Sequence, residues 1–453
     1  MTTAFSILPF TAARKLGGCF LKKAPASRFC GRRPVNRKCP GFRLTAFCEA
    51  LFLGSLPVRL LAGFILCVLS GHLVAQDPTS VPVPRSYFGL TVMRSRVTTP
   101  FDFGTVRVWD IWPVPDWARS NPSAGVYDFT SLDTFLAANN NRSRDVIYTF
   151  GRTPQWASSQ PNTNKGTGPG ECAPPTHIED WDHYVRAVVT HAAGRIKYWE
   201  LWNEPNLPMY YCGDMPTMVL LAKHAQRIIK GIDPSALILS PSATNAGGPD
   251  WLASFLAQGG SSAIDIVAFH GYRTQKAEDI LPLIAKYKAV MKANGVSGLP
   301  LWDTEANNKA PQTAEQESAF LAKYFLLQWS EGISRFVWYA YDAHPEWGQL
   351  WNPATNQASA ASTAYVQVYE WMVGATLVQP CSKDASGNWS CVLTRNGNQT
   401  EALWNSDAAT SVAVSPQFVQ YRDLLGKTYP IQNGTVAVGN EPILLIGSTK
   451  ARK

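Results

Sequence analysis

Two glutamates, each at the end of a hydrophobic segment, are the residues of this chain best suited to chemistry. Glu204 belongs to the stretch YWELWNEPN at 198–206, and Glu305 ends the stretch LPLWDTE. Pro205 has no backbone N–H to donate, so it stops a strand directly after Asn203 and Glu204. A carboxyl group that keeps its proton can act as an acid, and an ionised one can act as a nucleophile. The pattern therefore predicts two polar strand ends that share one site.

The elements that must position these residues follow a regular rhythm. From about residue 86, apolar β-rich runs alternate with amphipathic stretches, which is typical of βα units around a parallel sheet. We expect strands at 87–92, 105–110, 145–150, 196–202, 237–242, 264–270, 299–305 and 335–341. We expect helices between them, among others at 178–193, 215–232, 277–295 and 313–332. Eight such strands predict an α/β fold, a (β/α)8 TIM barrel, in which the carboxyl ends of the strands form the site.

Helix ends and a change of composition divide the chain further. Thr313 and Gln316 fit a capping box, and Gly295 and Gly332 fit C-terminal stops. After residues 362–374 the sequence turns to short alternating runs separated by Asn, Asp, Gly and Pro, which predicts a small all-β, sandwich-like domain. We therefore expect a leader at 1–75, a catalytic barrel at 76–375 and a β-rich domain at 376–453.

The net charge of +8 belongs to the start of the chain. Residues 1–75 hold 11 basic residues and one acid, Glu49, which leaves 30 of the 41 basic and 32 of the 33 acidic residues for the remainder. The remainder is nearly neutral and has no basic cluster, so a nucleic-acid partner is excluded.

The start of the chain also resembles an export signal. Arg59 precedes the apolar run LLAGFILCVLSG at 60–71, and cleavage after Ala75 fits a secretory signal around 59–75. A run of about 12 apolar residues is shorter than the roughly 20 that cross a bilayer. We expect a secreted or periplasmic protein. The alternative is a membrane anchor preceded by a cytoplasmic tail.

Cysteine usage agrees with an oxidising compartment. Five of the nine cysteines lie in the leader, and Cys172, Cys212, Cys381 and Cys391 remain. An even number outside the cytoplasm predicts disulfides, and no zinc-type spacing occurs among them. Cys381 and Cys391 flank a short turn-rich loop, so we expect them to pair. Cys172 and Cys212 lie in two long loops of one face and are the other candidate pair. Free thiols are the alternative.

Other chemically capable residues fall at the predicted strand ends, where a barrel carries its site. These are Arg107, Trp109 and Asp110 after the second strand; Arg152 and Trp156 after the third; His270 and Tyr272 after the sixth; and Trp338, Tyr339 and Asp342 after the eighth. Glu204 and Glu305 end the fourth and seventh strands, so the two carboxyl groups should face each other across the mouth of the barrel.

The motifs WNEPN, at the end of a fourth strand, and WDTEAN, at the end of a seventh, resemble those of retaining glycoside hydrolases of clan A. The resemblance is strongest to glycoside hydrolase family 39, with families 5 and 51 as neighbours, and it covers roughly residues 85–450. It implies a secreted O-glycosidase in which Glu204 is the general acid/base and Glu305 the nucleophile. It further implies double displacement on an oligo- or polysaccharide, without a cofactor or a metal.

The same resemblance implies substrate-binding roles. Asn203 corresponds to the residue that bonds the sugar 2-OH. His270 and Tyr272 match a His-x-Tyr pattern whose tyrosine contacts the nucleophile. Trp338 corresponds to an aromatic platform beneath the sugar ring. The alternative for His270 is an ordinary strand-end histidine that serves the fold.

Further expectations come from the residues themselves. A cationic Arg107 near Glu305 should lower the pKa of that carboxyl group, and it could instead be a structural ion pair. Asp303 has no role in the resemblance, but alternation along the strand puts it on the side of Glu305, where it could orient Arg107. Trp156 and Trp109 are candidate sugar platforms, since aromatic rings stack on carbohydrate; packing is the alternative.

Three functional readings remain open at this stage. A barrel that binds carbohydrate but lost catalysis is the alternative to a hydrolase, although both carboxyl groups are present. A metal-assisted enzyme is a third possibility. The seven histidines argue against it, because they are scattered along the chain and no two stand at the spacing of metal ligands. The insertion at 158–177 should wall one side of the cleft. The sugar, the linkage, exo or endo action and the oligomeric state are left open.

Overall fold

A computed structural model describes Asp77 and residues 80–447, except for 95–99, 141, 273–275, 309–312 and 343–347. The leader and signal predicted for 1–75 lie outside these described residues. Within the described part of the chain, no helix combines the length and apolar character needed to cross a membrane.

The strands between residues 88 and 338 form one parallel sheet. Its strands are β1 (Phe88–Leu90), β2 (Thr105–Val108), β3 (Asp145–Thr149), β4 (Tyr198–Glu200), β5 (Leu237–Leu239), β6 (Ala243–Thr244), β7 (Val267–His270), β8 (Leu301–Ala306) and β9 (Ile333–Trp338). They lie in the order β5-β4-β3-β2-β1-β9-β8-β7-β6. Each of the eight predicted strands is present. The fifth is interrupted, so β5 and β6 share its place.

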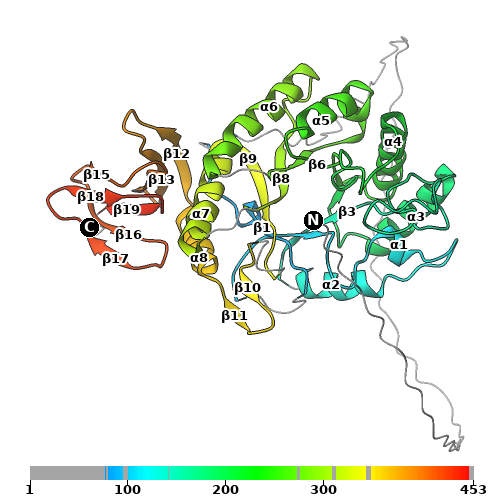
Figure 1. Cartoon of the computed structure of the whole chain (residues 1–453), viewed down its shortest axis with the longest axis horizontal. Helices are drawn as coiled ribbons and strands as arrows, with labels where there is room; N and C mark the ends of the chain where they lie inside the picture. The colour runs from blue at the N-terminus through cyan, green and yellow to red at the C-terminus, as the bar shows by residue number, and fades with distance from the viewer. Residues whose placement is uncertain are drawn as a thin grey trace, which may run out of the picture. The chain divides into compact units, whose positions relative to one another are not determined.

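The two edges of this sheet meet and close a barrel. Leu239 of β5 bridges in parallel to Ile266, just before β7, and the N–H of Ser240 donates to the carbonyl of Ile266 at 2.9 Å. β6 continues the same pairing with β7. The predicted (β/α)8 TIM barrel is therefore confirmed, with strands at its centre and helices around them (Figure 1).

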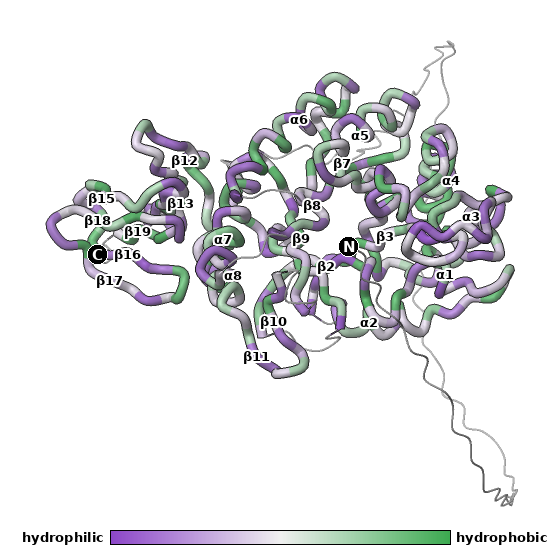
Figure 2. The backbone as a smooth tube through the Cα atoms, viewed as in Figure 1, coloured by the Kyte–Doolittle hydropathy of each residue, from purple (hydrophilic) through white to green (hydrophobic). Residues whose placement is uncertain are grey.

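Eight helices accompany the strands of the described residues. They are α1 (Trp117–Ser120), α2 (Thr130–Asn140), α3 (Ile178–Ala192), α4 (Met215–Ile232), α5 (Gly248–Ala257), α6 (Ile280–Ala293), α7 (Ala314–Ser330) and α8 (Ala360–Met372), with 3-10 turns η1 (Arg85–Tyr87), η2 (Gly260–Ala263) and η3 (Ala277–Asp279). The four predicted helices correspond to α3, α4, η3 with α6, and α7. Hydrophobic and hydrophilic residues alternate along helices such as α6, as expected for amphipathic helices that cover a sheet (Figure 2).

The predicted helix ends are also confirmed. Thr313 caps α7: its side chain accepts from the N–H of Gln316, and the Gln316 side chain accepts from the N–H of Thr313. Gly295 and Gly332 follow α6 and α7 with φ of 72° and 77°. Such left-handed conformations favour glycine, which explains why these helices end there.

The barrel interior is divided into an apolar layer and a polar layer. The apolar layer consists of Ile147, Tyr198, Leu239, Ile266, Ala268, Trp302 and Val337. The guanidinium of Arg335 lies over the rings of Tyr198 and Trp302, at 4.5 and 4.2 Å from their centroids. This packing fills the barrel below the carboxyl ends of the strands, so polar side chains gather only above it.

The region after α8 is all-β, as predicted. A six-stranded antiparallel sheet contains β12 (Thr376–Lys383), β13 (Trp389–Arg395), β14 (Asn398–Trp404), β16 (Phe418–Arg422), β17 (Thr428–Pro430) and β19 (Ile443–Gly447), and β15 (Thr410–Ala413) pairs with β18 (Thr435–Val438). Val436 and Val438 of β18 pack with Leu445 of β19, so the two sheets share a core. A short hairpin, β10 (Trp351–Asn352) and β11 (Gln357–Ala358), precedes α8. We propose the domain boundary between α8 and β12.

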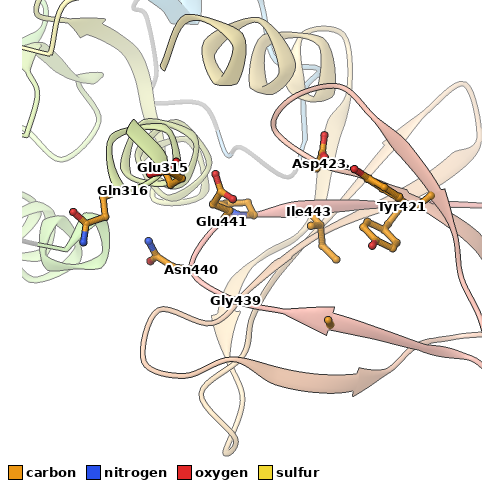
Figure 3. A pocket seen from close by; sticks show the side chains of 11 residues that line it. Glu315, Gln316, Tyr421, Asp423, Gly439, Asn440, Glu441 and Ile443 are labelled. Carbon is orange, nitrogen blue, oxygen red and sulfur yellow. Dashed lines mark hydrogen bonds between the residues drawn. The ribbon is translucent and has the colours of Figure 1, made fainter. Parts of the chain in front are cut away.

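A pocket of about 590 Å³ lies between the start of α7 and this β-rich region. Figure 3 shows Glu315 of α7 next to Glu441, with Tyr421 and Asp423 farther along the β-rich region. None of its lining residues is a predicted site residue. The pocket is therefore separate from the candidate active site.

Both expected disulfides are present. Cys172 pairs with Cys212, and Cys381 pairs with Cys391. The first joins the insertion at 158–177 to the loop that follows β4, and the second staples β12 to β13. The predicted pairing is confirmed in both cases.

Thr313→Ala should lower the free energy of unfolding by about 1 kcal/mol, because it removes the side-chain acceptor that caps α7. Urea denaturation followed by circular dichroism measures the change. Thr176→Ala, at an exposed threonine before α3, is the matched control. Equal stability of the two variants would contradict the capping role.

Candidate active site

One buried arginine organises the polar layer of the barrel. Arg107 of β2 is fully buried and donates three hydrogen bonds: from Nε to Glu200 at 2.8 Å, from Nη1 to Glu305 at 2.5 Å and from Nη2 to Asn203 at 2.8 Å. Its partners come from β4, from the turn after β4 and from β8. The guanidinium of β2 therefore joins side chains from β4, from the turn after β4 and from β8.

Glu200 is a site-supporting residue that the sequence reasoning did not single out. It is fully buried, and its two oxygens accept from Thr149 at 2.7 Å and from Thr304 at 2.6 Å in addition to Arg107. A charged residue within the apolar run YWELW was the available signal, since a carboxylate is buried in a barrel only when it is paired.

The chain turns sharply at Glu204, which explains the motif at the end of β4. Asn203 still bridges in parallel to Ser242, and the N–H of Glu204 donates to the Ser242 carbonyl at 3.0 Å. Glu204 then adopts a left-handed φ of 41°, and Pro205 follows. Its side chain is 9% exposed and contacts Nδ1 of His270 at 2.9 Å. The turn thus directs the carboxyl group toward β7.

The second glutamate is held from three sides. Oε2 of Glu305 accepts from Arg107, and Oε1 accepts from the Tyr272 hydroxyl at 2.8 Å. Nδ1 of His270 lies 3.9 Å from the same Oε1. One ligand-type atom from each of Glu204, His270 and Glu305 lies within 4.8 Å of the other two. The two glutamates therefore approach each other closely across the mouth of the barrel.

The electrostatics of Glu305 differ from expectation. Burial raises the pKa of Glu305 above its usual 4.5, while His270 and the Arg107 cation act in the opposite direction. The predicted direction of the arginine's influence is retained, but the expected net lowering of the pKa is wrong. Loss of hydration outweighs the attraction of the cation for a carboxyl group that is shielded on all sides.

Asp303 does not orient Arg107. Its Oδ1 accepts from the N–H of Gly271 at 3.1 Å. A Cβ atom added to Gly271 would meet both Oδ2 of Asp303 and the hydroxyl of Tyr324 in α7, so this carboxyl group lies on the side of that helix. The register of β8 against β9 shifts between Asp303 and Ala306. That irregularity brings both Thr304 and Glu305 to the barrel interior and leaves Asp303 on the helix side. Simple alternation was therefore the wrong basis.

Trp338 does not lie where a sugar platform would be. It is fully buried, donates from Nε1 to the Gly348 carbonyl at 3.0 Å and packs against Phe320 and Phe336. Its predecessor Val337 belongs to the interior layer, so alternation turns the Trp338 ring toward α7. A ring between strand and helix cannot stack on a ligand, and the predicted role is incompatible with this position.

Tyr339 is the aromatic residue that β9 delivers to the site. Its ring centroid lies 6.4 Å from that of Tyr272, and its hydroxyl donates to Asp110 at 3.1 Å. Tyr210, from the loop after β4, lies near the same carboxylates. Burial is the main cause of its raised pKa, and the negative charges of Asp110 and Glu204 raise the pKa further. Both tyrosines line the site. Tyr339 was named from the sequence as a strand-end residue without a role, and Tyr210 was not named.

The other two predicted tryptophans have different surroundings. Trp109 is buried beneath the guanidinium of Arg152, 4.5 Å from its ring, and beside the ring of Tyr210. It therefore supports the wall of the site. Trp156 is partly exposed, and its Nε1 donates to the carbonyl of Asn121 at 2.8 Å. It lines a separate cavity whose walls include neither of the two glutamates of the candidate active site.

The cluster of Glu204, His270 and Glu305 also resembles a cation site in its ligand types. The Glu305 oxygens, however, already accept from the Arg107 guanidinium and the Tyr272 hydroxyl. A divalent ion here would face the guanidinium cation at short range. The donor set therefore fits a carboxylate pair better than a metal centre.

Part of the chain is similar in sequence to a named glycosidase. A segment of 159 residues is 30% identical to a β-xylosidase from Caldicellulosiruptor saccharolyticus, and the match covers 31% of this chain and 32% of that protein. The chain thus aligns with about a third of that relative.

Solved structures show the same fold. A family 39 β-xylosidase from Caulobacter crescentus is 18% identical with a TM-score of 0.58, over 81% of this chain and 97% of that one. A family 30 xylanase from Clostridium acetobutylicum is 14% identical with a TM-score of 0.56, over 79% and 95%. Residues 131–369, more than half of the chain, match the family described as the glycosyl hydrolase catalytic core. The protein belongs to the glycosyl hydrolase catalytic core family.

Proposed function

We propose that the chain is a retaining glycoside hydrolase of clan A, most similar to family 39, with Glu204 as acid/base and Glu305 as nucleophile. The observation that carries the proposal is the close approach of the two carboxyl groups, whose nearest ligand atoms lie within 4.8 Å. Retaining enzymes keep their carboxyl groups about 5–5.5 Å apart, whereas inverting enzymes need about 6.5–9.5 Å to admit a water molecule.

In the first step, Glu305 attacks the anomeric carbon while the leaving oxygen departs. The bond from anomeric carbon to leaving oxygen breaks, a bond to a Glu305 oxygen forms, and the proton of Glu204 passes to the leaving oxygen. Arg107 and Tyr272 hold the two oxygens of Glu305 in the attacking orientation. The attack requires the ionised form of Glu305, which the Arg107 cation favours.

In the second step, water replaces the protein at the anomeric carbon. Glu204, now ionised, takes a proton from the water, whose oxygen bonds to the anomeric carbon as the bond to Glu305 breaks. His270 contacts Glu204 at 2.9 Å and lies between the two carboxyl groups. It is therefore placed to stabilise the ionised form of Glu204 between the two steps.

Asn203 is placed to recognise the sugar. Because its Oδ1 accepts from Arg107, its Nδ2 is the end that offers hydrogen-bond donors. A donor in this position suits the 2-OH of the sugar, whose hydrogen bond strengthens in the transition state.

We propose β-xylosidic bonds as the substrate class, because the curated relative is named a β-xylosidase and the two solved structures are a β-xylosidase and a xylanase. Export is proposed on the basis of the signal at 59–75, and the two disulfides agree with an oxidising compartment.

Hydrolysis of 4-nitrophenyl β-xyloside and of xylan, beside other aryl β-glycosides, tests the proposed activity and substrate class. Binding without release of sugar would instead favour a carbohydrate-binding barrel.

Glu305→Gln should lower kcat by about four orders of magnitude or more on every substrate, because no covalent intermediate can form. Release of 4-nitrophenol measures the loss. Glu331→Gln, at the partly exposed C-cap of α7 and paired there with Lys288, is the matched control and should retain activity. Substantial turnover by the Glu305 variant would remove it from the nucleophile role.

Glu204→Gln should behave differently. Substrates with poor leaving groups should lose about 10²–10⁴-fold in kcat/KM, while an aryl glycoside with a good leaving group should still form the intermediate. Azide should then restore turnover, since an anionic nucleophile needs no general base. The measurements are the leaving-group dependence and the β-glycosyl azide product; wild-type behaviour on both would contradict the assignment.

Tyr272→Phe should move the acidic limb of kcat/KM to higher pH. The Tyr272 hydroxyl bonds the charged form of Glu305, so its loss raises the pKa of Glu305 further above 4.5. The ionised nucleophile is then lost earlier as the pH falls. Tyr87→Phe, at a buried tyrosine that bonds the Phe325 carbonyl, should leave the limb in place. A limb that stays fixed in both variants would refute the coupling.

A further inference from the structure

A cavity of about 370 Å³ lies beside the loop that follows β3, apart from the two glutamates. Its lining combines three prolines with Arg119, Gln155, Trp156 and Glu171. Apolar rings and a few charged groups in one concave site are typical of small-molecule recognition.

Glu171 leaves one oxygen of its carboxyl group without a partner. The residue is 7% exposed, and its Oε1 pairs with Nη2 of Arg119 at 2.9 Å. Its Oε2 is buried and has no hydrogen-bond partner among the residues that the structure describes. A buried acceptor without a donor costs roughly 1–3 kcal/mol or more, so a ligand hydroxyl placed there would relieve that cost.

Trp156 supplies a fixed aromatic ring in the same cavity. Its Nε1 donates to the Asn121 carbonyl at 2.8 Å, which holds the indole in place while part of it stays exposed. Sugars present C–H groups on one face and hydroxyls around their edge. A tryptophan ring and an acceptor carboxylate in one cavity match these two features.

The loop that carries both residues is held rigidly. The Ser158 hydroxyl donates to the Gly170 carbonyl at 2.8 Å. The residue after Glu171 is Cys172, and its disulfide with Cys212 ties this loop to the loop after β4. A subsite that is formed before binding loses little entropy when a ligand arrives.

A chain of ion pairs connects the cavity to the candidate active site. Arg119 pairs with both Glu171 and Asp116, Asp116 lies 3.3 Å from Arg152, and Arg152 lies 3.0 Å from Asp110. Asp110 in turn accepts from Tyr339 at the site. Because these residues follow β2 and β3, the cavity opens on the same face of the barrel as Glu204 and Glu305.

We infer that this cavity is a further sugar-binding subsite, in which Trp156 stacks on a sugar unit distant from the cleaved bond and Oε2 of Glu171 accepts from its hydroxyls. The inference rests on the proposed function and deepens it: the substrate is a xylo-oligosaccharide or a xylan chain that reaches from the two glutamates to this cavity. A single xyloside does not use it.

The experiment compares xylobiose through xylohexaose as substrates of the full chain. For the wild type, kcat/KM should rise with length until the cavity is occupied. Glu171→Gln and Trp156→Ala should each reduce the ratio of kcat/KM for xylohexaose to that for xylobiose about tenfold. Glu179→Gln, in the exposed first turn of α3, is the matched control and should keep the ratio.

The outcomes separate this inference from the proposed function. Hydrolysis of xylobiose with no gain from added length, or a ratio unchanged in both variants, overturns the subsite and leaves the hydrolase proposal standing. If no oligosaccharide is cleaved, the proposed function fails, and calorimetric binding of xylohexaose decides the subsite. Binding that weakens about tenfold in Glu171→Gln supports it, and equal or absent binding overturns it.

Discussion

The arrangement of the candidate site depends on the burial of one cation, Arg107. A guanidinium that leaves water loses hydration worth several kcal/mol, and only well-aligned acceptors compensate for that loss. Here Glu200 and Asn203, at the end of β4, and Glu305, in β8, provide them. Each acceptor is in turn oriented by the same cation. The geometry of the site therefore depends on this cation, which connects β2 to β4 and β8.

This dependence explains the division of the barrel interior. Below the site, aromatic and aliphatic side chains fill the space, and the cation of Arg335 lies over the rings of Tyr198 and Trp302. Above them, Glu200 receives hydrogen bonds from two threonines as well as from Arg107. Water is thus excluded from beneath the carboxyl groups. In that setting hydrogen bonds and charges act more strongly than they would at an exposed surface.

Much of the fold and part of the site were predictable from local patterns. Strand and helix positions follow from hydrophobic periodicity, and residues at strand ends meet at one face once a barrel is assumed. For that reason Arg107, Asn203, Glu204, His270, Tyr272 and Glu305 were selected correctly as neighbours. Their meeting required only the topology and the strand ends, both of which the sequence carries.

Asp303 and Trp338 were misplaced for one physical reason, which is the side of a strand to which a residue points. The register shift in β8 separates Asp303 from Glu305, and alternation in β9 turns Trp338 away while it delivers Tyr339. A one-residue change in register exchanges the two faces of a strand, and no composition signal marks it. Glu171 was missed for a different reason, since its environment is set by a loop folded against Arg119 and by the disulfide of the neighbouring Cys172.

The charged residues around the site form a connected path rather than isolated pairs. Asp116 illustrates this: burial raises its pKa to about 6 even though Arg119 and Arg152 both stabilise its charge. Its ionised form therefore depends on both arginines staying in place. Because Arg119 also holds Glu171 and Arg152 also holds Asp110, a sugar hydroxyl at Glu171 would act on one end of a path whose other end contacts Tyr339. A continuous set of contacts therefore joins the wall of the distant cavity to the aromatic wall at the two glutamates.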